Sequence, residues 1–115
     1  MRWQLRSKII NAIITETNIN YVGSITIDKT LVEKAGFKEG EKVLVASYDS
    51  GERIETYIIL GPPYSGEIVM NGPAALKIRK GEKVTIMGFE LTDKKIRPKV
   101  IMLDRKNTFL KYIQK

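Results

Sequence analysis

The chain has 115 residues, of which 43% are apolar and 29% are charged, a composition typical of a single soluble globular domain. It contains neither cysteine nor histidine, which excludes disulfides, thiol nucleophiles, histidine general bases and ordinary zinc sites, so we expect no metal centre. The net charge of +7 is uneven, because residues 1–76 carry 8 Lys and Arg against 9 Asp and Glu, whereas residues 77–115 carry 12 against 4.

Alternating and β-branched apolar residues predict a chain that is mainly β. In chain order, the expected strands cover residues 5–15, 24–28, 42–48, 53–60, 67–70, 83–91 and 99–103. A turn at residues 49–52 joins two of them into a hairpin, and the apolar side chains of residues 107–115 predict that this end docks on the fold. Many short strands with two short helical connections suggest one domain, residues 1–115, built as a closed β-barrel.

Two short helical segments interrupt the strands. The first lies between Asp28, which has a favourable N-cap side chain, and Gly36, which ends it, and its apolar residues recur at helical spacing. The second begins within residues 71–76, where a proline is allowed because its missing N–H would have no partner in a first helical turn.

No apolar run approaches the roughly 20 residues that a transmembrane helix needs, and the first residues do not lead into a signal-peptide core. We therefore expect a cytoplasmic protein with no membrane partner. The basic second half favours nucleic-acid binding, but its cations gather at turns and lack the interleaved aromatic side chains on which bases stack. We accordingly expect no nucleic-acid partner.

A glycine followed directly by a serine, Gly23-Ser24, lies between a polar turn and the second expected strand. Its ordinary interpretation is a turn that needs glycine. The alternative is chemistry on the backbone, in which the serine oxygen attacks the Gly23 carbonyl carbon and elimination across Ser24 then cuts the chain. The remaining dehydroalanine would hydrolyse to a pyruvoyl group. This ketone is an electrophile that could serve in catalysis in a chain without cysteine or histidine.

Four groups of residues occur together in this order: Lys8; Tyr21-Val22-Gly23-Ser24 with Ile27-Asp28; Gly51-x-Arg53-x-x-Thr56-Tyr57; and Asn71-Gly72-x-Ala74-Ala75. Their combination resembles the pyruvoyl-dependent aspartate 1-decarboxylase family over residues 1–103. The resemblance implies a six-stranded double-psi β-barrel and a homotetramer with sites between neighbouring subunits. It also implies self-cleavage into a β chain, residues 1–23, and an α chain, residues 24–115. The implied reaction converts L-aspartate to β-alanine and carbon dioxide, a step toward pantothenate and coenzyme A.

The resemblance also implies roles for single residues. Ser24 is the precursor of the covalent pyruvoyl cofactor, whose ketone would condense with the amine of aspartate to give an imine. Tyr57 matches the proton donor to the carbanion left by carbon dioxide, since a phenol stays neutral at physiological pH. Thr56 matches the residue that assists self-cleavage, by donating a hydrogen bond to the oxyanion formed at the Gly23 carbonyl.

Two cations, Lys8 and Arg53, match the two carboxylates of aspartate. We expect Arg53, with its bidentate fork, to hold the side-chain carboxylate that the product keeps. The resemblance completes the substrate pocket with Thr56, Tyr21, Asn71, Gly72, Pro73, Ala74 and Ala75, of which Pro73 departs from a commoner alanine.

Each of these residues also has an ordinary interpretation as a solvated charge, a packing side chain or a capped helix start. Two other functions therefore stay open: a basic β-barrel regulator that binds DNA, and an assembly module that keeps the fold without cleaving. A maturation factor is a further possible partner.

Overall fold

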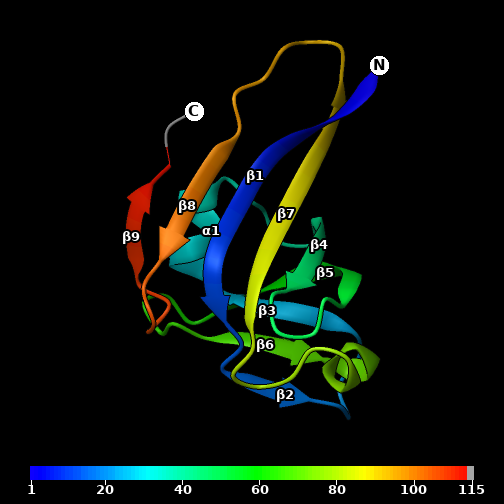
Figure 1. Cartoon of the computed structure of the whole chain (residues 1–115), viewed down its shortest axis with the longest axis vertical. Coiled ribbons are helices and arrows are strands. Elements are labelled where there is room, and N and C mark those ends of the chain that lie inside the picture. The colour runs from blue at the N-terminus through cyan, green and yellow to red at the C-terminus, as the bar shows by residue number, and fades with distance from the viewer. Residues whose placement is uncertain (114–115) are drawn as a thin grey trace.

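The computed structural model describes residues 1–113, and within them strands predominate over two short helices (Figure 1). The elements in order are β1 Arg2–Ile13, β2 Glu16–Asn18, β3 Ser24–Asp28, α1 Lys29–Ala35, β4 Lys42–Ser47, β5 Arg53–Gly61, β6 Ile68–Asn71, the 3-10 helix η1 Gly72–Leu76, β7 Lys83–Thr92, β8 Lys99–Leu103 and β9 Phe109–Tyr112. The prediction of a mainly β chain is confirmed.

The strands form one hydrogen-bonded series in the order β2-β6-β3-β5-β4-β7-β1-β8-β9. Three neighbouring pairs are parallel, namely β2 with β6, β3 with β5 and β1 with β8, and the other pairs are antiparallel. Figure 1 shows β1, β7 and β8 along the long axis, with β3, β6 and β2 crossing below them. Closure of this sheet into a six-stranded double-psi barrel stays a prediction.

Two strands were not expected. The polar segment of β2 has no strand-like alternation, and it is extended because it pairs in parallel with β6. The predicted docking of residues 107–115 takes the form of β9, which pairs with β8, while residues 114–115 lie outside the described part of the chain.

The predicted helix is confirmed as α1. The buried Asp28 carboxylate accepts hydrogen bonds from the backbone N–H of Thr30 at 2.8 Å, of Tyr64 at 3.1 Å and of Gly66 at 2.9 Å. It therefore caps the helix and holds the loop between β5 and β6 at the same time. Gly36 ends the helix in the left-handed region, with φ of 78°.

Strand register gives the sheet an apolar and a mixed face, since residues paired on neighbouring strands point to the same side. On one face lies a fully buried row formed by Ile9, Ile86 and Val45, which continues to Ile54 on β5. We call the opposite side, which carries polar and exposed residues, the outer face. A chain this small gains most of its stability from the apolar face.

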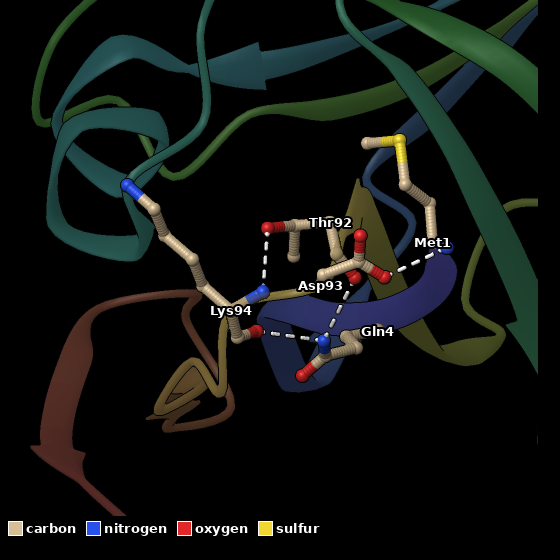
Figure 2. Close-up of polar contacts among 5 residues, drawn as sticks. All are labelled: Met1, Gln4, Thr92, Asp93 and Lys94. Carbon is tan, nitrogen blue, oxygen red and sulfur yellow. Dashed lines mark hydrogen bonds and ion pairs between the residues drawn. The ribbon is translucent and has the colours of Figure 1, made fainter.

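The connection from β7 to β8 is held by one side chain of β1 (Figure 2). The Gln4 amide nitrogen donates to the carbonyl oxygens of Thr92 at 3.1 Å and Lys94 at 2.7 Å. Beside it, the Met1 ammonium group lies 2.7 Å from the Asp93 carboxylate. The amino-terminal strand thus orders a loop that lies far from it in sequence.

Across residues 1–113 the structure has no helix of the length and apolarity required to span a membrane.

Candidate functional site

Ser24 opens β3 and is completely buried. Asn71, the last residue of the antiparallel neighbour β6, is its partner in the register and is also buried. The Asn71 side-chain nitrogen donates to Ser24 Oγ at 2.8 Å and to Thr26 Oγ1 at 3.0 Å. The serine hydroxyl therefore lies in a dry, specific hydrogen-bond environment rather than in a solvated turn.

The turn before Ser24 rests on the backbone of Gly72. Gly72 has φ of +77°, and a Cβ there would lie 2.7 Å from Gly23 Cα, 2.8 Å from Gly23 N and 3.0 Å from the Tyr21 carbonyl oxygen. Only glycine leaves room for this approach and adopts this φ without strain. The expected grouping of Asn71 and Gly72 with the Gly23-Ser24 bond is therefore present in the structure.

The other small residues of the expected pocket lie in η1, which begins at Gly72. Pro73 occupies the first helical turn and is exposed, Ala74 is half-buried and Ala75 is buried. Tyr21 is 48% exposed, so it borders the turn rather than filling its interior.

Tyr57 comes next to Ser24 through the parallel pairing of β3 and β5. Ile25 pairs with Ile58, so the residues one step earlier, Ser24 and Tyr57, lie at neighbouring positions and point to the outer face. Tyr57 is 40% exposed. One step earlier again, Thr56 is level with Gly23, but it pairs with Val43 and points toward the apolar face.

Arg53 and Lys8 share the outer face with Tyr57 but lie further away. Arg53 is exposed and precedes Tyr57 by four residues on β5, about 13 Å along an extended strand. Lys8 on β1 is paired in register with Met87, which continues the row to Leu44 and Glu55. In the strand order, β1 is four places from β3, so the two strands are about 19 Å apart along the sheet. Along the sheet of one chain, Lys8 and Ser24 are therefore separated by the width of several strands.

A cavity of about 530 Å³ opens on the outer face at the start of β4. It is lined by Trp3, Phe89, Leu44, Val43, Glu41, Lys42 and Glu55, and Lys42 pairs with Tyr57 in the register. Trp3 is 70% and Phe89 41% exposed, so this part of the outer face is apolar and open.

Sequence reasoning missed Thr26, whose hydroxyl shares the Asn71 amide with Ser24. The signal was available, because two hydroxyl residues separated by one position on a strand point to the same face. It was overlooked because a threonine in a strand is ordinary for its β-branched shape alone.

A family model described as aspartate decarboxylase matches residues 1–110 of the chain. An "Aspartate 1-decarboxylase" of Clostridium botulinum (strain 657 / Type Ba4) is 49% identical over 111 residues, covering 93% of this chain and 87% of the relative. Proteins with the same name are 47% identical in Caldicellulosiruptor saccharolyticus, covering 96% and 90%, and 44% identical in Pseudothermotoga lettingae, covering 93% and 95%.

Proposed function

The chain belongs to the aspartate decarboxylase family, and from this premise we propose how its own residues make and use a catalytic ketone. Its activity is the 1-decarboxylation of L-aspartate. Removal of the carboxylate next to the amine leaves β-alanine and carbon dioxide, a reaction consistent with a place in pantothenate biosynthesis. The observation that carries the mechanistic proposal is the buried hydrogen bond between Asn71 and Ser24 Oγ.

The chain cuts itself between Gly23 and Ser24, giving residues 1–23 and 24–115. Ser24 Oγ attacks the Gly23 carbonyl carbon, and the peptide bond to the Ser24 nitrogen is replaced by an ester. The close approach of Gly72 to Gly23 supports this step, because a rigid turn keeps the two reacting atoms together. Thr56, level with Gly23 on β5, is proposed to stabilise the oxyanion.

The residues around Ser24 fit a pyruvoyl group, since the serine is buried, follows a glycine and meets a neutral amide instead of a competing charge. This group would supply a ketone that binds the substrate amine and accepts electrons as carbon dioxide leaves.

Tyr57 is proposed to give a proton to the substrate carbon after decarboxylation. Its position next to Ser24 in the β3–β5 register supports this role, because a general acid must lie within reach of the carbon that it protonates. Arg53 is proposed to bind the retained side-chain carboxylate through its planar fork.

The proposed assembly is a homotetramer with sites between subunits. Lys8 and Ser24 are separated along the outer face by more than the length of one aspartate molecule, so Lys8 would serve the Ser24 of a neighbouring copy. The exposed apolar side chains of Trp3, Phe89 and Leu91 on the same face support burial against another chain.

Intact mass spectrometry of the purified protein tests the proposal. We expect two fragments, residues 1–23 and 24–115, the second lighter by one ammonia than simple hydrolysis gives. Ser24→Ala should stay whole and inactive with an unchanged fold. A wild-type chain that decarboxylates aspartate while remaining uncut would overturn the pyruvoyl mechanism.

Three further expectations stay predictions. A maturation factor would be indicated if the chain is cut in its native cells but not after purification as a precursor. Fractionation of those cells tests the cytoplasmic location. Binding to DNA that falls steeply with salt would favour the regulator alternative as an additional activity.

A further inference from the structure

The Asn71 amide group donates both of its hydrogen atoms to hydroxyl oxygens of β3. One goes to Ser24 Oγ at 2.8 Å and the other to Thr26 Oγ1 at 3.0 Å. A primary amide is planar, so the position of one N–H determines the position of the other. The Thr26 hydroxyl thereby orients the donor that reaches Ser24.

Thr26 is itself held in one orientation by the neighbouring strand. Its methyl group lies against Gly61 on β5, where a Cβ would come within 3.0 Å of Thr26 Cγ2. Gly61 is buried and pairs with Asp28, which follows Thr26 by two residues on β3. Because the methyl occupies the space above a glycine, the hydroxyl is left to face Asn71.

We propose that Thr26 is a positioning residue for self-cleavage, acting through Asn71 on the oxygen that leaves Ser24. This inference rests on the proposed self-cleavage at Gly23. It concerns the second half of that reaction, which follows ester formation.

In the ester, Oγ joins the Gly23 acyl carbon to Ser24 Cβ, and the Ser24 nitrogen is an amine. A base removes the Cα proton, the electron pair forms the Cα–Cβ double bond, and the Cβ–Oγ bond breaks. Oγ departs as one oxygen of the Gly23 carboxylate, and water then replaces the nitrogen of the dehydroalanine, releasing ammonia. Negative charge therefore grows on Oγ, and an N–H aimed at that oxygen stabilises this transition state.

The test is Thr26→Val, which keeps the β-branched shape and removes the acceptor. The uncut precursor is purified quickly, and its cleavage is followed over time by intact mass spectrometry, with and without hydroxylamine. Hydroxylamine cuts an ester to leave a serine at the new amino terminus, whereas elimination leaves a pyruvoyl group. We expect cleavage slowed about threefold to tenfold, as one lost hydrogen bond implies, with a larger hydroxylamine-sensitive fraction.

Two controls separate positioning from general damage. Thr26→Ser should restore the wild-type rate, since it keeps the hydroxyl. Thr85→Val is the matched control, because it also removes the hydroxyl of a buried strand threonine. Thr85 lies on β7, away from Ser24, and its hydroxyl donates to the Tyr48 hydroxyl at 3.0 Å. The Thr85→Val chain should cleave normally. Should Thr26→Val not fold, Gly61→Ala displaces the Thr26 methyl instead and should slow cleavage in the same way.

Wild-type kinetics in Thr26→Val, or equal slowing in Thr85→Val, would overturn the role of Thr26 while leaving self-cleavage intact. An uncut wild-type chain would instead overturn the proposed function on which the inference rests.

Discussion

At the scale of single residues, the close approach of Gly72 to Gly23 predicts a large effect from one methyl group. Gly72→Ala would place a Cβ 2.7 Å from Gly23 Cα at a φ of +77°, so the turn must shift. We expect a loss of stability of about 1–3 kcal/mol, measured by denaturant unfolding, and little or no chain cleavage. Gly40→Ala is the control, since its φ is +82° with open space around the new atom, and it should lose stability without losing cleavage.

A second residue-scale prediction concerns substrate binding. Arg53→Lys keeps the charge but loses the bidentate fork, so the KM for aspartate should rise by about tenfold or more while kcat falls less. Steady-state kinetics on fully cleaved protein measure both constants, with the turn residue Arg79→Lys as a control. An unchanged KM would remove Arg53 from the substrate site.

Asn71 and Gly72 were recognised as site residues from the sequence, but their contacts were not. A motif names residue types in order. The hydrogen bond from the Asn71 amide to Ser24 Oγ, however, joins residues 47 positions apart and depends on the pairing of β3 with β6. Lys8 shows the same limit, since its separation from Ser24 follows from strand order and not from spacing in the chain.

At the scale of elements, local signals were sufficient for α1 and for the hairpin of β4 and β5. Asp28 and Gly36 mark the helix ends by their own side-chain and backbone chemistry, and the hairpin needs only a turn between two apolar runs. β2 is different, because a Glu-Thr-Asn segment becomes a strand only when β6 is beside it.

The turn between β8 and β9 predicts a pH effect. The Asp104 carboxylate accepts backbone hydrogen bonds from Thr108 at 3.0 Å and Lys106 at 2.9 Å, which lower the pKa of Asp104 below its ordinary value. Because the folded pKa is lowered, the turn gains stability above the ordinary value near about 4 and loses it as pH falls through the lowered pKa. NMR titration should show Thr108 and Lys106 amide signals following Asp104, and Asp104→Asn should abolish this change.

The connection between β7 and β8 gives another element-scale prediction. Gln4→Glu removes the donor that binds the carbonyls of Thr92 and Lys94, so hydrogen exchange in residues 93–97 should become faster. Exchange in β3 and β6 should not change. Equal protection in both proteins would mean that the pair between Met1 and Asp93 is enough to order the loop.

At the scale of the whole molecule, the pattern of apolar residues predicted the mainly β class, but assembly lies beyond both composition and local pattern. The outer face collects side chains from the four strands β1, β7, β4 and β5, so its apolar area appears only after the register is known. We expect Trp3→Asp to shift sedimentation toward smaller species and to lower decarboxylation, because a charge enters the proposed interface. Tyr64→Asp, at a residue 87% exposed in the β5–β6 loop, should leave assembly unchanged.

If the chain is cut between Gly23 and Ser24 as proposed, the position of β1 between β7 and β8 changes the molecularity of folding. Residues 1–23 supply that interior strand and β2, so after cleavage the fold becomes a complex of two fragments that share one core. The uncut chain carries β1 and β2 covalently, whereas the cut protein, once unfolded, must find residues 1–23 in solution before its core can form. The melting temperature of the cut protein should therefore rise more steeply with protein concentration than that of uncut Ser24→Ala, and the cut protein should refold less completely after dilution.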